Sequence, residues 1–198
     1  MGHYTQKKIS FCITCMNRRH HLEKTLKKNI QDNYLPGNVE FVLLDYNSSD
    51  HLEEWVNEEM GNYITSGLLV YYKTKTPVYY HRSHSRNMVF RLAKGDILCN
   101  LDADNFLGEG FALNMIDEFS RNSNIFYTSD LSLNDIFGRV VMLSEDFFSI
   151  RGYNELLEGY GFEDVDLYVR LLNRELKHMI FTHSFYYNLS FASSTCLF

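Results

Sequence analysis

Two aspartates separated by one residue are the first feature of the sequence that could do chemistry. Asp102 and Asp104 follow an apolar stretch in DILCNLDADNF, which begins at residue 96. Residues i and i+2 of an extended chain point the same way, so we expect both carboxylates side by side at a strand end. Like charges that close repel unless something positive lies near them. The pair therefore suits Mg²⁺ or Mn²⁺, with an ordinary solvated turn as the alternative.

A basic group lies at the start of a predicted helix. Arg82, His84 and Arg86 stand within five residues of one another. Helix N-termini and arginines both favour phosphate, so this group could meet a nucleotide, and a solvated basic helix end is the alternative. His81 and His84 have an H-x-x-H spacing, but we expect loop histidines here and not a metal pair.

A second acidic group stands in GYGFEDVDLYVRLL, at the start of another predicted helix. Its members are Glu163, Asp164 and Asp166. Acidic residues in a first helical turn commonly stabilise the helix dipole or cap the helix. The functional alternative is a general base, approached through Gly159 and Gly161.

The segments that carry these groups alternate between strands and helices. Apolar stretches rich in β-formers predict strands, and apolar residues at helical spacing predict helices. Ser49 or Asp50 is expected to cap the second helix, and Gly95 to end the third. We expect strands at 8–14, 39–45, 68–73, 96–102 and 124–128, and helices at 17–32, 48–60, 83–95 and 109–120. Beyond them we expect a strand at 137–144, a loop at 144–162, a helix at 163–176, and one or two strands within 178–191.

This order predicts an α/β fold with a mostly parallel sheet flanked by helices. Ligands of such sheets bind at the carboxyl ends of the strands. The residues that follow the first, second and fourth strands should therefore converge there: 14–18, 45–47 and 102–104.

Composition limits the classes of function. The chain has 198 residues, 45% of them hydrophobic, which suits one domain with a sizeable core. A net charge of −6 argues against a nucleic-acid binder. We find no membrane span and no leader, leave peripheral membrane contact open, and expect a cytoplasmic protein. Cys12 and Cys15 fall on opposite faces of a predicted strand, so buried free thiols are expected and not a redox or zinc site.

Taken together, these motifs resemble a GT-A fold glycosyltransferase of the family-2-like kind. The resemblance covers nearly the whole chain and rests on four segments: ISFCITCMNRRHHLEKTLKKN, VEFVLLDYNSSD, HSRNMVFRLAKGDILCNLDADN and GYGFEDVDLYVRLL. The third is the closest match, and the last is similar to the late E-D motif of galactosyltransferase and chondroitin polymerase domains.

The resemblance implies a metal-dependent, inverting enzyme of polysaccharide biosynthesis. It would move a sugar from a nucleotide-diphosphate donor, preferably a UDP-sugar, to a glycan, a lipid-linked saccharide or a related hydroxyl acceptor. Residues 1–105 would form the nucleotide-sugar-binding half of one domain and residues 106–198 the acceptor-binding half. The implied donor-binding residues are Thr14, Asn17, Arg18, Asp45, Arg86 and Asp102, with Asp45 reading the base. The implied metal (Mn²⁺ or Mg²⁺) residues are Asp104 and Asp102, and the implied catalytic residues are Asp164 as base and Glu163 as the group that orients the acceptor.

The sequence departs from the family pattern at three places. After the first strand the family usually has Pro, Thr or Ala and an aromatic residue, where this sequence has Thr14-Cys15-Met16. After the second strand many relatives have a glycine, which Asp45-Tyr46-Asn47 lacks. Many relatives complete the metal site with a late histidine. Asn188 stands at the position that aligns with it, and His183 is a nearby substitute.

Three other classes of protein remain as alternatives. A nucleotidyltransferase usually has a glycine-rich loop after the first strand, and TCMNRRHH has no glycine. A non-catalytic nucleotide-sugar or glycan-binding module of the same fold is disfavoured by the intact D-x-D and E-D motifs. A phospho-receiver needs an aspartate after the third strand, where YYKTKTPVYYH has no carboxylate.

Overall fold

A seven-stranded sheet forms the centre of the molecule. The computed structural model describes residues 7–130, 138–159, 161–181 and 187–188. The strands run in the order β3-β2-β1-β4-β7-β6-β8. Their bounds are β1 (Ile9–Cys15), β2 (Val39–Tyr46), β3 (Leu69–Thr74), β4 (Ile97–Asn100), β6 (Ile125–Thr128), β7 (Val140–Leu143) and β8 (Lys177–Ile180).

The expected mostly parallel sheet is confirmed. β1 pairs in parallel with both β2 and β4, and β2 pairs in parallel with β3. β7 alone runs against its neighbours β4 and β6, while β6 and β8 are parallel to each other. β1, β2 and β4 are buried along their whole length, which explains why their sequences are mostly apolar and do not alternate between apolar and polar residues.

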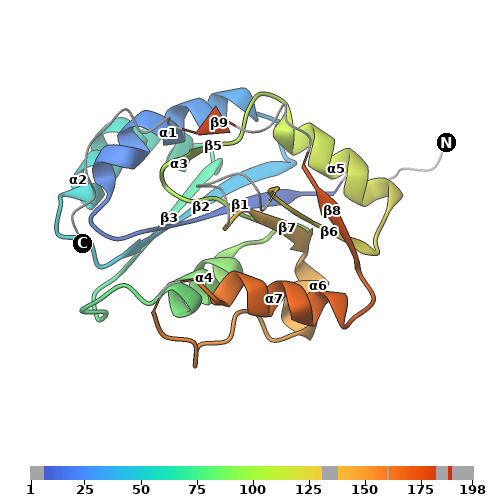
Figure 1. The fold of residues 1–198 in the computed structure, drawn as a ribbon. Helices are drawn as coiled ribbons and strands as arrows, with labels where there is room; N and C mark the ends of the chain where they lie inside the picture. Colours follow the sequence, from blue (N-terminus) through green and yellow to red (C-terminus); the bar gives the residue numbers. More distant parts are fainter. Residues whose placement is uncertain (1–6, 131–137, 160, 182–186, 189–198) are drawn as a thin grey trace.

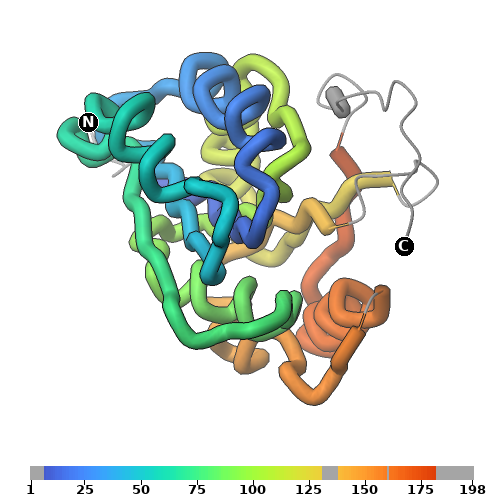
Figure 2. The backbone as a smooth tube through the Cα atoms, turned by 90° about the vertical axis from the view of Figure 1, so that its left-hand side faces the viewer, coloured from blue at the N-terminus to red at the C-terminus, as the bar shows by residue number. Residues whose placement is uncertain are grey.

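Helices cover both faces of the sheet (Figure 1). One layer contains α1 (Arg19–Asp32), α2 (Leu52–Glu59), α3 (Gly61–Thr65) and α5 (Phe111–Arg121), and the other contains α4 (Arg82–Leu92), α6 (Ser144–Ser149) and α7 (Glu163–Leu172). Figure 2 shows the two layers from the side, with the blue and cyan helices above and the green and orange helices below. No helix in the described part of the chain is long and apolar enough to cross a membrane.

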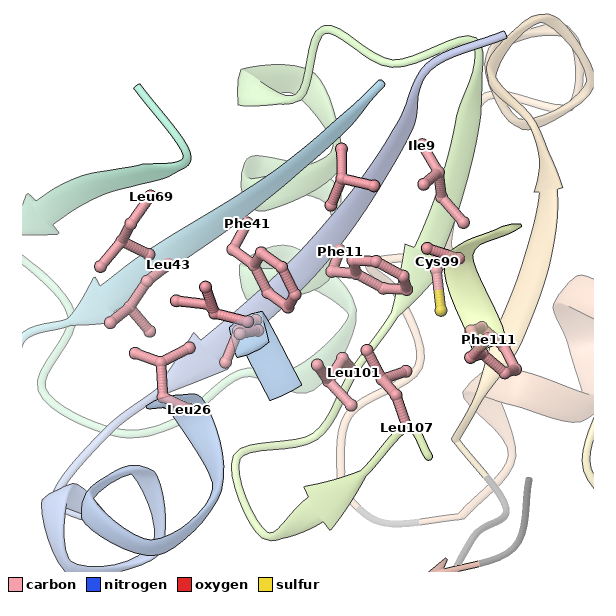
Figure 3. Close-up of a cluster of buried hydrophobic side chains, with 14 of the residues drawn as sticks. Ile9, Phe11, Leu26, Phe41, Leu43, Leu69, Cys99, Leu101, Leu107 and Phe111 are labelled. Carbon is pink, nitrogen blue, oxygen red and sulfur yellow. The ribbon is translucent and has the colours of Figure 1, made fainter. Parts of the chain in front are cut away.

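Each face of the sheet has its own hydrophobic core, because alternate side chains of a strand point to opposite faces. Phe11 and Phe41 pack with Leu26 of α1 and Phe111 of α5 (Figure 3). On the other face, neighbours of these strand residues pack against α4, α6 and α7. Cys12, Cys15 and Cys99 are buried and free, as expected, and Cys196 lies outside the described residues.

A small antiparallel pair lies apart from the main sheet. β5 (Asn105–Phe106) pairs with β9 (Tyr187–Asn188), and Asn105 lies opposite Asn188. The backbone of the late segment therefore reaches the residue that follows Asp104.

Several boundaries differ from those expected. Residues 144–149, expected as part of a loop, form α6, which buries Phe147. The short helix α3 was not expected. α4 ends at Leu92, before Gly95. Gly95 is needed for a different reason: a Cβ there would lie 2.5 Å from Ser10 Oγ.

The cap expected for α2 is wrong. The helix begins after His51, whose backbone is left-handed, and no side chain caps it. The two expected caps make other contacts: Asp50 Oδ2 accepts from the Arg19 amide at 2.8 Å, and the Ser49 amide donates to Asn17 Oδ1 at 2.7 Å. Both bonds join the ends of β1 and β2, so tertiary contacts outweigh the local capping preference.

Candidate active site

The D-x-D segment is a turn and not an extension of β4. β4 ends at Asn100, and the Asn105 amide donates to the Asp102 carbonyl at 3.1 Å. The expected extended geometry of Asp102 and Asp104 is therefore wrong. α1 fixes the turn, because Thr25 Oγ1 donates to the Ala103 carbonyl at 2.7 Å. The two carboxylates still interact: burial and the charge of Asp102 raise the pKa of Asp104.

One buried guanidinium joins this turn to the E-D motif. Arg86, on α4, is 1% exposed. Its Nη1 donates to Asp164 Oδ1 at 2.7 Å and lies 3.5 Å from Glu163 Oε1. Its Nη2 donates to Asp102 Oδ1 at 3.4 Å. Burial opposes the charge of Arg86, but the carboxylates, Asp164 first, raise its pKa, so the guanidinium remains charged.

The two aspartates that bind Arg86 have pKa values shifted in opposite directions. Burial raises the pKa of Asp102, but Arg86 and Arg82 outweigh burial and hold it below its usual value. For Asp164, burial is the largest influence, and with the charge of Glu163 it outweighs Arg86, so the pKa is raised. A carboxylate with a raised pKa is a better proton acceptor.

Glu163 and Asp166 have structural contacts of their own. Glu163 is 4% exposed; its Oε2 accepts from the Gly161 amide at 3.0 Å, and its Oε1 lies 3.2 Å from Arg82 Nε. Asp166 Oδ2 accepts from Arg170 Nη2 at 2.6 Å. Arg170 Nη1 also donates to the Gly152 carbonyl, so Asp166 supports the connection between α6 and α7.

Two residues that the sequence analysis did not single out help to position the Arg86 guanidinium and its partner Asp102. A Cβ on Gly138 would clash with Arg86 Nη2 and lie 3.0 Å from Asp102 Oδ2. The Gly138 carbonyl accepts from Asn100 Nδ2 at 2.8 Å, and the same Nδ2 donates to Asp102 Oδ1 at 3.2 Å. Gly138 and Asn100 are far from Arg86 in sequence, and no local pattern marks either.

Tyr153 is a further neighbour of the cluster. Its ring centre lies 5.4 Å from the Arg86 guanidinium carbon, and its hydroxyl donates to Asp164 Oδ1 at 3.4 Å. Asn87 fixes Tyr153 twice, since its Nδ2 donates to the Tyr153 carbonyl and its Oδ1 accepts from the Tyr153 amide. In the sequence, the adjacent Arg86 and Asn87 of α4 were the signal that could have pointed to Tyr153. Arg86 binds the carboxylates, and Asn87 fixes the loop that contains Tyr153.

Asp45 lies at the end of β2 with both oxygens in use. It is 0% exposed. Oδ1 accepts from the Ser48 amide at 2.7 Å, and Oδ2 accepts from the Tyr71 hydroxyl at 2.8 Å. Burial and Asp45 raise the pKa of Tyr71, so its hydroxyl remains a donor. Lys73 Nζ is 3.9 Å from Oδ2.

The residues after β1 divide between two places. Thr14 Oγ1 shares a hydrogen bond with the Tyr80 hydroxyl at 2.6 Å, and Asn17 is bonded to Ser49. Arg18 is exposed, and its Nη1 lies 3.8 Å from Asp104 Oδ2. Arg18 therefore forms an ion pair with Asp104, while Thr14 contacts Tyr80 in the loop that follows β3.

The two histidines of the H-x-x-H spacing hold the start of α4. His81 is the N-cap, and its Nδ1 accepts from the His84 amide at 3.2 Å. His84 Nδ1 shares a hydrogen bond with the Tyr46 hydroxyl at 2.6 Å. His84 lies in the helix and not in a loop, and both rings have protein partners.

The D-x-D turn has the donor chemistry that a divalent cation requires. Asp102 and Asp104 keep 35% and 25% of their side chains exposed. Mg²⁺ or Mn²⁺ is often held by one or two carboxylates together with substrate phosphates, so these two oxygen donors fit. Within the described residues, no group of three or more His, Cys, Asp or Glu side chains could hold a metal. His183 lies outside those residues.

Comparison with known proteins identifies the family and the fold of this chain. The sequence profile of glycosyl transferase family 2 matches residues 10–194. The chain belongs to this glycosyltransferase family. No curated protein matches the chain. The sheet and its helix layers are those of the GT-A fold.

Solved structures share the fold at low identity. A mannosyltransferase, PcManGT from Pyrobaculum calidifontis in complex with GDP-Man and Mn²⁺, has a TM-score of 0.75 at 14% identity, over 91% of this chain and 56% of that one. GalNAc-T7 with UDP, GalNAc and Mn²⁺ has a TM-score of 0.73 at 16% identity, over 88% and 42%. S. aureus TarS 1–349 has a TM-score of 0.68 at 12% identity, over 83% and 55%. The chain thus spans about half the length of these structures.

Proposed function

We propose that this chain is the catalytic domain of a metal-dependent, inverting glycosyltransferase. Its donor would be a nucleotide-diphosphate sugar, with a UDP-sugar favoured, and its acceptor a saccharide hydroxyl in polysaccharide biosynthesis. One observation carries the proposal: Arg86 Nη2 bonds Asp102 of the D-x-D turn while Nη1 bonds Asp164 of the E-D motif. The two motifs therefore lie next to each other, joined by one side chain.

Each carboxylate has a separate role in the proposed reaction. Asp104, with Asp102, would hold Mn²⁺ or Mg²⁺, which supplies positive charge to the diphosphate. The Asp104–Asp102 repulsion that raises the pKa of Asp104 would be relieved by a cation. His183 is the candidate for a further ligand.

Asp164 would act as the general base. One of its oxygens takes the proton of the acceptor hydroxyl, whose oxygen bonds to the anomeric carbon while the bond from that carbon to the diphosphate breaks. The nucleotide diphosphate leaves from the opposite side, so the anomeric configuration inverts. Arg86 limits the rise in the pKa of Asp164, which keeps the base ionised before it accepts the proton. Glu163, whose Oε2 accepts from the Gly161 amide, would orient the acceptor.

The donor nucleotide would lie along the ends of β1 and β2. Asp45 would accept from the base, and Thr14, Asn17 and Arg18 would line the base and ribose. Because both oxygens of Asp45 and both terminal nitrogens of Arg86 already have protein partners, direct contact of these groups with a nucleotide needs these bonds to open. We further propose that residues 1–105 bind the donor and 106–198 the acceptor, and that the protein acts in the cytoplasm.

Isothermal calorimetry with UDP tests the metal and donor together. We expect UDP to bind tightly with Mn²⁺ and weakly with EDTA, and Asp104→Ala to remove the difference. Asp117→Ala is the control, because Asp117 is an exposed aspartate on α5 whose ion-pair partner among the described residues is Arg121, at 3.7 Å. Equal affinity with and without metal would contradict the proposal, and equal binding of GDP would contradict the preference for uracil.

A further inference from the structure

The outer face of α7 carries a row of exposed apolar side chains. Phe162, Val165, Val169 and Leu172 are 75%, 50%, 49% and 48% exposed. We call these four residues the α7 stripe. Polar side chains would be expected at these positions if the surface faced only water.

The opposite face of the same helix is also apolar. Leu167, Tyr168 and Leu171 are buried against the sheet. A helix that is apolar on both faces is ordinarily covered on both. Figure 1 draws α7 on the outside of its layer, with no described helix beyond it. By contrast, α1, the longest described helix, has no large hydrophobic side chain among the exposed ones.

The spacing of the α7 stripe suits a second helix. The four residues stand at i, i+3, i+7 and i+10, which is the spacing of a helix–helix seam. A seam of this kind is self-complementary when two copies lie antiparallel about a two-fold axis. Phe162 of one copy would then lie near Leu172 of its mate, and Val165 near Val169.

The charges at the two ends of α7 favour the same arrangement. The exposed Glu155 and Glu158 precede the helix, and the exposed Arg174 and Lys177 follow it, with Glu175 offsetting one of these. In an antiparallel pair the acidic end of each helix lies beside the basic end of the other. The two helix dipoles then point in opposite directions, which is also favourable. An anionic membrane would instead meet a chain of net charge −6.

We propose that the α7 stripe is the surface through which two copies of this chain associate. The inference does not depend on the proposed activity. Four side chains cover less than the roughly 800 Å² per partner of a stable interface, so the dimer is weak, with dissociation in the micromolar range.

Sedimentation velocity across a micromolar concentration series tests this dimer. We expect the sedimentation coefficient of the wild type to rise with concentration, and Val169→Asp to raise the dissociation constant about tenfold or more, because the seam would bury an unpaired carboxylate. Leu113→Asp is the matched control. Leu113 is 45% exposed on α5, across the sheet from α7, and its replacement should leave association unchanged. Circular dichroism verifies that both variants are folded.

A charge exchange tests the antiparallel orientation. Arg174→Glu should weaken the dimer severalfold, and adding Glu158→Arg should restore it. A wild type that stays monomeric throughout, or Val169→Asp that associates like the wild type, overturns the proposal. A monomer that binds neutral phosphatidylcholine vesicles through Val169 overturns it in favour of a membrane face. Weakening by Arg174→Glu without rescue overturns the antiparallel arrangement.

Discussion

Two acidic sites at the carboxyl edge of the sheet balance their charge in different ways. Asp45 has no exposed surface, accepts from two neutral donors, the Ser48 amide and the Tyr71 hydroxyl, and has one cation, Lys73 Nζ, 3.9 Å from its Oδ2. Near the D-x-D turn, a single buried guanidinium serves three carboxylates, and its Nε has no hydrogen-bond partner among the described residues.

The Asp45 site therefore has all its hydrogen-bond partners within the protein, whereas the cluster around Arg86 still carries excess negative charge. Neutral donors fix Asp45 whether or not a ligand is bound. Around Arg86 the three carboxylates outnumber the positive charges even with Arg82 included, and the Asp104–Arg18 pair leaves this excess unchanged. Such a cluster gains from a bound cation and keeps Asp164 ready to take a proton. The predictions below act on one site or the other.

The largest expected effect is on sugar transfer. Asp164→Asn preserves shape but cannot accept a proton, so transfer should fall by about 10²–10⁴-fold while UDP binding persists. Transfer is measured as UDP released from the donor with a panel of saccharide acceptors. Asp166→Asn is the control, because Asp166 pairs with Arg170 and should leave transfer unchanged. Normal transfer by Asp164→Asn, with loss in Asp166→Asn or Glu163→Gln, would move the base to that residue.

Removing the guanidinium should have the largest effect on stability. Arg86→Met leaves Asp102, Glu163 and Asp164 without their shared cation, at a cost of about 3–5 kcal/mol in the free energy of unfolding. Urea denaturation measures this cost. Arg91→Met, an exposed arginine of the same helix, should change stability by no more than about 0.5 kcal/mol.

The pH dependence of that cost identifies its cause. Arg86 lowers the pKa of Asp102 and opposes the rise at Asp164, so its contribution is present while the carboxylates are ionised. As pH falls, Asp164, with its raised pKa, protonates first and Asp102, with its lowered pKa, protonates later, so the deficit of Arg86→Met should shrink progressively over the acidic range. A deficit that stays constant with pH would indicate lost packing and not lost charge.

The sequence predicted the fold well because the signals were local and strong. Apolar runs in β1, β2 and β4, separated by helical spacing, are sufficient for a parallel sheet, and its carboxyl edge indicates where ligands bind. The errors arose where distant contacts decide. The Asp102–Asn105 turn is fixed by α1 through Thr25, and α2 lost its expected cap to contacts between strand ends.

The candidate site was predicted in part. The motifs around Asp102 and Asp164 were found as patterns, but nothing in either pattern says that one arginine joins them. Arg86 was expected at a nucleotide, and the structure shows it buried among carboxylates, because α4 and α7 pack on the same face. Gly138 gave no signal at all, since its constraint comes from a side chain far away in sequence.

A smaller effect is expected at the neutral site. Asp45→Ala leaves the Ser48 amide and the Tyr71 hydroxyl without an acceptor, which should cost about 1–3 kcal/mol of stability. If Asp45 also reads the base, UDP affinity falls by about 1.5–3 kcal/mol. Tyr71→Phe frees one oxygen of Asp45, so it should keep or raise UDP affinity. Unchanged UDP binding in Asp45→Ala would make Asp45 a turn residue only.

The smallest change tests how closely the two motifs must approach. Gly138→Ala adds one methyl group that clashes with Arg86 Nη2, so the guanidinium must move away from Asp102. The bond to Asp102, already long at 3.4 Å, should break before the 2.7 Å bond to Asp164. We expect a loss of about 1–3 kcal/mol of stability from overpacking. Gly61→Ala, where an added Cβ meets nothing within 4 Å, is the control and should cost nothing. If Gly138→Ala is as stable as the control and binds UDP with Mn²⁺ like the wild type, the Arg86–Asp102 contact does not hold the D-x-D turn in place. If it loses metal-dependent binding but little stability, the contact positions Asp102 for the donor, and the charged cluster then differs from the Asp45 site in function as well as in charge balance.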